Sequence, residues 1–330
     1  MASRRPGSWI AAAAAALVAA AVVLPLVGPV RVDLARAWAG VSPDHEILFH
    51  ARLPRVLLAL LAGGTLAAAG ALFQALLRDA LATPYTLGVS SGASLGAVLA
   101  MSLGWEQILG FPAVWAAAFV GAATVLALVV AIASEGRRMS SFTLLLAGVT
   151  INSICLALIL LLQYLAGFAQ SIAIVRWLMG GIEAVSYGVL AAVACAVLPA
   201  VAFVCWRARE WNLLAVGEEW AAARGVDTSR ALLAGYLAGS FVTGSITALT
   251  GPIGFVGLIV PHALRLKVGA DHRLLIPCSF LAGAPFLALC DTLARTVAAP
   301  TEIPVGVITA MLGGPFFIWL LRSRRRSLWL

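Results

Sequence analysis

Asp291 and Arg295 are the ionisable pair whose position most invites chemistry. They lie four residues apart in the apolar run 274–297, so a helix would place both on one face. Ionisable residues inside membrane segments are candidates for function by default. The two opposite charges can also simply compensate each other near the outer membrane surface. An aspartyl protease would need a second aspartate in another uncharged run, and the sequence has none there. An intramembrane enzyme, to be tested by mutating Asp291, therefore stays a rival to the structural interpretation.

Other residue types that could do chemistry do not form a catalytic or metal-binding pattern. The histidines lack metal-ligand spacing and the cysteines stand alone without a C-x-x-C pair, so neither zinc nor disulfides are indicated; these residues are His45, His50, His262, His272, Cys155, Cys195, Cys205, Cys278 and Cys290. The chain contains no G-x-x-x-x-G-K-[ST] sequence and cannot hydrolyse a nucleotide by a P-loop mechanism. We expect no catalytic residue, metal or cofactor in this chain, and any ATP and Mg must be used by a partner subunit.

The composition is that of an integral membrane protein. Of the 330 residues, 62% are hydrophobic and only 11% are charged. Because a membrane-spanning helix needs about 20 apolar residues, the uncharged runs predict an all-α polytopic protein with ten spans. The predicted spans are 9–29, 56–77, 84–104, 111–133, 141–166, 186–206, 231–250, 253–267, 274–297 and 303–321.

The orientation follows from the basic ends "SRRP" and "RSRRR". Short cytoplasmic flanks retain Lys and Arg, so an even number of spans predicts both termini in the cytoplasm. The net charge of +8 then reflects topology, and nucleic acid is not indicated as a partner. Acidic and histidine residues cluster at the ends of the spans, whereas a proton-coupled secondary transporter would usually place them at the midplane. A pathway of small, neutral groups suits a large and partly apolar solute.

Glycine and other small residues recur along the spans at three- or four-residue spacing. Such faces let helices approach closely, which predicts a compact bundle. In the stretch "TGPIGFVGLIVPHALR", Gly251 and Pro252 are expected to separate the seventh and eighth spans. Gly254 and Gly257 are expected to allow close helix contacts.

The segment 30–55 is predicted to be extracytoplasmic. It ends with Arg52 and Arg55, and Arg295 lies at the same outer level at the end of the ninth span. Arginines at an outer surface could form a docking patch for an acidic partner, by electrostatic complementarity. Simple contacts with lipid headgroups explain them equally well.

The segment 207–230 is predicted to be cytoplasmic and to contain a short helix. In "GEEWAAARG", acidic residues Glu218 and Glu219 precede an alanine run, Arg224 closes it, and Gly225 terminates it. Asp227 or Thr228 is expected to cap the seventh span. Because so short a helix is marginal alone, we expect a partner surface to pack on it; a self-contained loop is the alternative.

Several ordered segments together resemble the FecCD-type permeases, the membrane subunits of ATP-binding-cassette (ABC) importers for iron-siderophore, heme and cobalamin. The resemblance runs from about residue 50 to 322. It rests on "ARLPRVLLALLAGGTLAAAGALFQALLRDALATPYTLGVSSGASLG", "LLLAGVTINSICLALILLLQYLA", "VRWLMGGIEAVSYGVL", "WNLLAVGEEWAAARGVDTSR", "TGPIGFVGLIVPHALRLKVGADHRLLIP" and "AGAPFLALCDTLARTVAAPTEIPVGVITAMLGGPFFIWLL".

The resemblance implies a single permease domain over 1–330 with a type II ABC importer fold, in a bacterial inner membrane. It implies a homodimer, two cytoplasmic ABC ATPase subunits and an extracytoplasmic solute-binding protein. The substrate would be an iron-siderophore complex, with heme and cobalamin as alternatives. A secondary transporter or channel without ATPases remains the rival.

The resemblance also implies residue roles. Docking of the binding protein would use Arg52, Arg55 and Arg295. Coupling to the ATPase would use Glu218, Glu219, Ala221, Arg224, Gly225, Val226 and Arg230. A cytoplasmic gate and the pathway would use Ser140, Ser141, Phe142, Thr150 and Asn152. One departure concerns the turn after the second span, where Asp79-Ala80-Leu81-Ala82 stands in place of the family's Asn-Pro-Leu-Ala.

Overall fold

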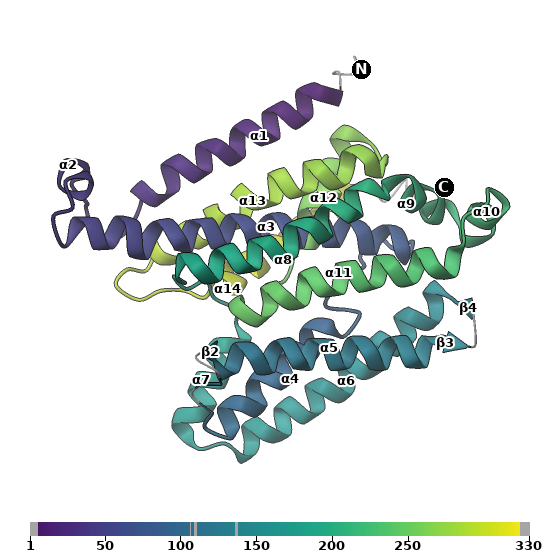
Figure 1. Ribbon diagram of the computed structural model, residues 1–330, viewed down its shortest axis with the longest axis horizontal. Coiled ribbons are helices and arrows are strands. Elements are labelled where there is room, and N and C mark those ends of the chain that lie inside the picture. Colours follow the sequence, from purple (N-terminus) through teal and green to yellow (C-terminus); the bar gives the residue numbers. More distant parts are fainter. Residues whose placement is uncertain (1–5, 106, 109–110, 136–137, 324–330) are drawn as a thin grey trace.

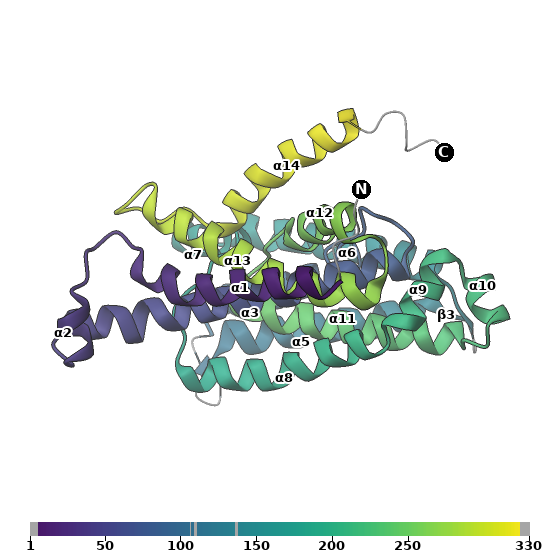
Figure 2. The ribbon, with the colours of Figure 1, turned by 90° about the horizontal axis from the view of Figure 1, so that it is seen from above.

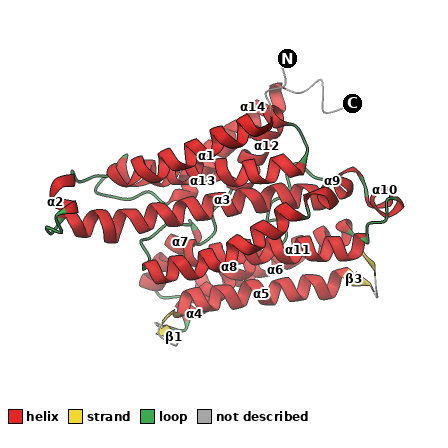
Figure 3. Cartoon of the chain, turned by 45° about the horizontal axis from the view of Figure 1, so that its top comes forward, coloured by secondary structure: helices red, strands yellow, loops and turns green. Residues whose placement is uncertain are grey.

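The computed structural model describes residues 6–105, 107–108, 111–135 and 138–323, and this part of the chain is almost wholly helical (Figure 3). The elements are, in chain order, α1 (Pro6–Val23), η1 (Leu24–Leu26), α2 (Leu34–Trp38), η2 (Glu46–Arg52), α3 (Leu53–Leu76), α4 (Val89–Ser102), β1 (Gln107–Ile108), β2 (Phe111–Pro112), α5 (Ala113–Ala133), β3 (Ser134–Glu135), β4 (Arg138–Met139), α6 (Ser141–Leu165), α7 (Phe168–Leu178), α8 (Tyr187–Trp206), α9 (Ala208–Val216), α10 (Glu218–Ala223), α11 (Thr228–Thr250), α12 (Val256–Val268), α13 (His272–Thr296) and α14 (Val305–Ser323).

Helix α3 is the central element of the bundle and is buried along most of its length. It packs against α13, α12 and α11, and α1 lies across the α13 side (Figure 1). Glycines make these crossings close. A Cβ atom on Gly63 would lie 2.3 Å from the carbonyl oxygen of Gly283, and one on Gly70 would lie 1.9 Å from that of Gly257. The small residues of the sequence thus set helix spacing, as expected.

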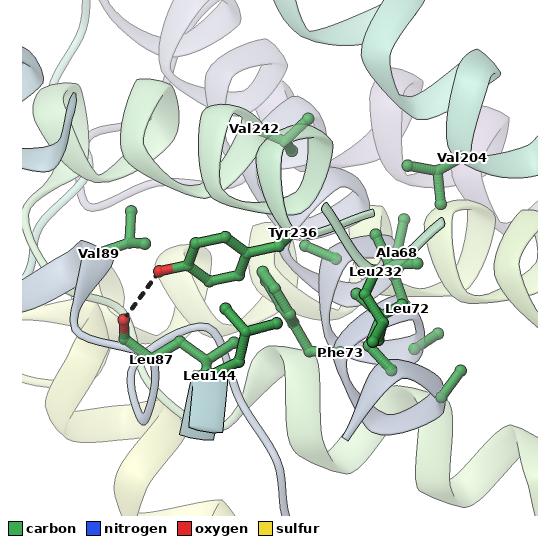
Figure 4. Packing of buried hydrophobic residues seen from close by; sticks show 14 of the residues in the cluster. Ala68, Leu72, Phe73, Leu87, Val89, Leu144, Val204, Leu232, Tyr236 and Val242 are labelled. Atoms are coloured by element: carbon green, nitrogen blue, oxygen red, sulfur yellow. Dashed lines mark hydrogen bonds between the residues drawn. The ribbon is translucent and has the colours of Figure 1, made fainter. Parts of the chain in front are cut away.

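A second group of helices, α4, α5 and α6, lies beside α11 (Figure 1). Its helix contacts also depend on glycine, since a Cβ on Gly96 would lie 2.0 Å from the carbonyl oxygen of Ala117. Tyr236 of α11 fills the junction between the two groups, packing edge-on against Phe73. Its hydroxyl donates a 3.4 Å hydrogen bond to the Leu87 carbonyl (Figure 4).

Side-chain caps fix where several helices begin. Asp227 accepts from the Arg230 N–H at the start of α11, which identifies Asp227 as the cap of the predicted pair. Asp271 accepts from the Arg273 N–H at the start of α13. Burial alone would raise the pKa of the Asp271 carboxyl, but hydrogen bonds from the Asn212 amide and the Arg273 N–H hold that pKa below its ordinary value.

Each of the ten predicted spans contains one helix, and the break at Gly251-Pro252 is confirmed. Within the described residues, seven helices are long and apolar enough to cross a membrane: those at Gly7–Leu26, Glu46–Leu76, Ala113–Ala133, Ser141–Leu165, Tyr187–Trp206, Thr228–Thr250 and His272–Thr296. The helices in the third, eighth and tenth predicted spans are shorter or less apolar, and α14 slopes away from the bundle (Figure 2). The count of ten and the orientation stay predictions, and most of the basic residues of the two ends lie outside the described residues.

The structure corrects three expectations. The helix that contains the second predicted span begins at Glu46 and not near residue 56, because η2 continues directly into α3. Charged Arg52 and Arg55 are compatible with this helix since partners within the chain satisfy both side chains. Gly254 makes no close contact, in contrast to Gly257. Finally, two two-residue antiparallel strand pairs, β1–β2 and β3–β4, flank α5 in an otherwise helical chain.

Candidate functional site

The predicted functional residues lie at two opposite ends of the bundle. The arginines belong to η2, the start of α3 and the end of α13, at the end where α2 lies (Figure 1). The predicted coupling and gate residues belong to α10 and the start of α6, at the end where β3 and β4 lie (Figure 1). Helix α3 runs between these two ends, so the predicted docking and coupling sites are separated by the length of the bundle.

Arg55 is the centre of an ionic cluster at the first end. Its Nη2 lies 3.0 Å from Asp291 Oδ1 and its Nε lies 3.1 Å from Oδ2, while Nη1 lies 2.9 Å from Glu302 Oε2. Asp291 is only 1% exposed, whereas the Glu302 side chain is 54% exposed. Arg55 therefore joins a buried carboxylate to a surface carboxylate through one planar guanidinium group.

Asp291 pairs mainly with Arg55, and the predicted pair with Arg295 is present as a weaker second contact. The Nε atom of Arg295 lies 3.9 Å from Asp291 Oδ2, at the edge of ion-pair distance. Its Nη2 instead donates to the Leu24 carbonyl at 3.1 Å and to the Thr292 hydroxyl at 3.2 Å. The helical spacing of the two residues is as expected, but the donor with the better geometry toward Asp291 is Arg55, from another helix.

The three predicted docking arginines come close together but differ in exposure. Arg52 is 5% exposed and donates to the carbonyls of Leu26 and Val30. Arg295 is 4% exposed. The Arg55 side chain is 15% exposed and lines an open pocket of about 510 Å³. Arg55 is thus the member of the trio that a partner could reach most directly in this conformation.

Charged and aromatic side chains line this pocket. They include Arg176 and Glu183, which are exposed, and two tryptophans, Trp115 and Trp177. Glu302 shares the wall with Arg55. The sequence gives no sign of the role of Glu302, because its loop folds back onto Arg55 only in the assembled bundle.

The coupling segment forms the short helix that the sequence predicts. Helix α10 begins at Glu218, Arg224 caps its end, and Gly225 adopts a φ of 84°, the left-handed conformation that glycine tolerates. Ala221 is fully buried and Val226 packs against the main core. Arg230 pairs with Asp227 at 3.0 Å on the surface. Glu219, Arg224 and Trp220 are exposed, so one face of α10 is available.

The predicted gate residues occupy two different faces of α6. Ser140 is the N-cap, its hydroxyl oxygen accepting from the Phe142 N–H at 3.2 Å. Ser141 is buried against other elements, whereas Phe142 is 71% exposed. Thr150 is also exposed, with its hydroxyl donating to the Leu146 carbonyl, and Asn152 is half-buried. Phe142 and Thr150 therefore stay candidates for a pathway surface, while Ser141 faces the protein interior.

Glu218 and Ser141, predicted separately for coupling and for the gate, are in direct contact. Glu218 Oε1 accepts from the Ser141 hydroxyl at 2.6 Å and from the Ser141 N–H at 3.1 Å. Arg78, at the end of α3, donates to the Ser141 hydroxyl oxygen at 3.0 Å and lies 3.5 Å from Glu218 Oε1. Sequence reasoning missed Arg78, although it stands beside the turn in which the chain departs from the family pattern.

That turn is closed by a side chain instead of a proline. Asp79 Oδ1 accepts from the Leu81 N–H at 2.8 Å, and the Asp79 carbonyl accepts from the Ala82 N–H at 3.1 Å. This Asx-type arrangement replaces the fixed φ that proline would supply. It also explains how Asp79-Ala80-Leu81-Ala82 forms a defined turn.

The fold is a polytopic helical bundle in which the short, partly exposed helix α10 lies between α9 and the long helix α11. The FecCD transport family matches residues 11–323. The hemin transport system permease protein HmuU of Yersinia pestis is 38% identical over 284 residues, covering 86% of this chain and 85% of the relative. The vitamin B12 import system permease protein BtuC of Citrobacter koseri is 40% identical over 278 residues, covering 83% of this chain and 82% of the relative.

Among solved structures, an ABC transporter described as of metal-chelate type, in an inward-facing conformation, has a TM-score of 0.83 and 31% identity. The match covers 96% of this chain and 99% of that chain. The protein therefore belongs to the FecCD transport family, and it is a membrane permease of the ABC transporter type.

Proposed function

We propose that this chain forms half of the translocation channel of an ATP-driven importer. Two copies would form a homodimer, two cytoplasmic ABC ATPase subunits would use ATP and Mg, and an extracytoplasmic solute-binding protein would deliver the solute. ATP-driven closure of the ATPases would pull on α10 and alternate the access of the pathway. The membrane would be a bacterial inner membrane with the basic chain ends in the cytoplasm.

The observation that carries this proposal is the position of α10. It is a separate short helix with an exposed face, at the end of the bundle opposite the Arg55 cluster. A helix of two turns is marginal alone, and here Ala221 and the Glu218 bonds to Ser141 anchor its inner face. The exposed face of α10 would bind an ATPase subunit, and at the opposite end Arg55, with Arg52 and Arg295 behind it, would dock a binding protein.

We propose an iron-siderophore complex as the substrate, with heme and cobalamin as alternatives. The relatives named above transport hemin or vitamin B12, and the similar solved structure is of the metal-chelate type. All are large solutes with apolar parts, which suits a pathway that avoids charged side chains. Phe142 and Thr150, on the exposed face of α6, are the residues we expect the solute to pass.

The proposal is tested by reconstituting the chain with its cognate ATPase and binding protein in vesicles. Uptake of iron-loaded siderophores, hemin and cyanocobalamin is measured with and without internal or external ATP. We expect one of these solutes to accumulate only when ATP, the ATPase and the binding protein are present together. Uptake that persists without the ATPase, and stops when a proton or sodium gradient is dissipated, would instead support a secondary transporter or channel.

A further inference from the structure

We infer that Glu218 is a positioning residue that connects the coupling helix to the gate end of α6. The inference rests on the proposed function, because it presupposes that α10 is moved by an ATPase subunit. Its content is separate: the Glu218 carboxylate bonds directly to the first residue of α6 and carries that movement to it. Without this contact, the hydrogen bonds of the described residues would tie α6 to the segment 218–229 only through the bond between Met139 and Ser229.

The geometry at the start of α6 makes Glu218 part of that helix's cap. The first N–H groups of a helix have no partner within the helix, and a negative charge beside them is favourable. Glu218 Oε1 accepts from the N–H and from the hydroxyl of Ser141, at 3.1 Å and 2.6 Å. Ser141 is only 3% exposed, so water cannot readily replace the carboxylate. Ionised acceptors form stronger hydrogen bonds than neutral ones.

A second contact holds the same short stretch of chain from the other side of α10. The Ser229 hydroxyl, at the start of α11, accepts from the Met139 N–H at 3.2 Å. Residues 139–141 therefore bond both to Glu218, the first residue of α10, and to Ser229, which follows α10. Displacing the segment 218–229 as a unit must pull on residues 139–141 and hence on Phe142, which follows directly.

Arg78 is a third residue in the contact between Glu218 and Ser141. It donates to the Ser141 hydroxyl oxygen at 3.0 Å and stands two residues after the end of α3, the central helix. Its φ of 54° lies in the left-handed region, which is uncommon for a residue with a side chain. Ser141 thus bonds both to Arg78, just after α3, and to Glu218, the first residue of α10.

The experiment uses the whole reconstituted transporter and the solute that the wild type takes up from the panel of siderophores, hemin and cyanocobalamin. ATP hydrolysis and uptake are measured for Glu218→Ala, Glu218→Gln and Ser141→Ala. Losing a charge-assisted cap corresponds to roughly a tenfold change in the equilibrium it supports. We expect Glu218→Ala to keep ATP hydrolysis but lose about tenfold in solute transported per ATP, with Glu218→Gln between it and the wild type.

Two further measurements separate positioning from general damage. The double variant Glu218→Ala with Ser141→Ala should be no worse than Glu218→Ala alone, because both remove the same contact. Spin labels at Leu146 and Ala223, both exposed, should keep one distance on ATP binding in the wild type and spread in Glu218→Ala. Asp79→Asn is the matched control, since it makes the same carboxylate-to-amide change nearby and keeps an acceptor for the Leu81 N–H.

The outcomes are distinct. A wild-type complex without ATP-dependent uptake would refute the proposed function itself. Wild-type coupling in Glu218→Ala, or independent and additive losses in the double variant, would overturn the role of Glu218 alone. Release of the ATPase from Glu218→Ala and Glu218→Gln complexes would also overturn it, because Glu218 would then be an assembly contact and not a link to α6.

Discussion

At the residue scale, the sequence identifies the charged residues of the outer cluster but not their partners. Asp291 and Arg295 share a helix face, and helical spacing alone makes them a pair. The stronger partner of Asp291 is Arg55, 236 positions away in the sequence. That contact exists only because α3 and α13 cross closely, through Gly63 and Gly283. Long-range packing of this kind leaves no local pattern to read.

The two carboxylates that bind Arg55 should differ greatly in how much they contribute to stability. Asp291 is buried, so Asp291→Ala leaves buried Arg295 without its carboxylate and Arg55 with Glu302 alone, and it should lower the free energy of unfolding by about 3–5 kcal/mol. Glu302 is largely exposed, so Glu302→Gln should cost only about 0–1 kcal/mol. Thermal unfolding of the purified chain in detergent measures both. Equal effects would mean that the Asp291 contact is not the buried anchor.

Glu302 should also compete with an acidic partner for Arg55. It occupies Nη1 of Arg55, the part of the guanidinium group that faces away from Asp291. If Arg55 docks a binding protein, Glu302→Gln should tighten capture, and the gain should shrink with added salt. Glu183→Gln is the control, since Glu183 is exposed in the same pocket. Unchanged capture in Glu302→Gln, or an equal change in Glu183→Gln, would contradict the competition.

At the element scale, the sequence predicts which segments are helices and where most of them end. Its errors have physical causes. The start of the second span is misplaced because Arg52 and Arg55 look like a boundary, whereas carbonyls and carboxylates of other elements satisfy them inside the helix. The close contact expected at Gly254 is absent, since that residue lies in the loop before α12 and not at a helix crossing.

At Gly70, where α3 crosses α12, any side chain should destabilise the fold. A Cβ there would lie 1.9 Å from the carbonyl oxygen of Gly257, and backbone cannot move aside as a flexible side chain can. Overpacking usually costs about 1–3 kcal/mol, and Gly70→Val should reach or exceed the upper end of that range. Gly254→Ala is the control, because nothing lies within 4 Å of a Cβ at that position. Thermal unfolding should show a large loss for the first variant and little for the second.

At the scale of the whole molecule, the hydrophobic pattern predicts a membrane protein. It does not predict which apolar helix surfaces contact lipid, a second copy of the chain or the solute. In the most apolar stretch of the helix Glu46–Leu76, which contains α3, 89% of the residues are buried. The corresponding shares are 28% in α6 and 17% in α8. Lipid, a second copy and a solute pathway all accept apolar side chains. The sequence cannot distinguish these neighbours, because all three allow the same residue types on a helix face.

If two copies enclose the pathway, the exposed face of α6 must meet its counterpart across the dimer. Thr150 lies on that face, and its hydroxyl is already bonded to the Leu146 carbonyl, so replacing it should not disturb the fold. In a variant whose native cysteines are replaced by alanine, Thr150→Cys should therefore be joined by a short bifunctional maleimide into a species of twice 34.2 kDa. Leu198→Cys, on the exposed face of α8, should stay single because that face would meet lipid. Cross-linking of Leu198→Cys with none of Thr150→Cys would place the second copy against α8 and remove α6 from the pathway.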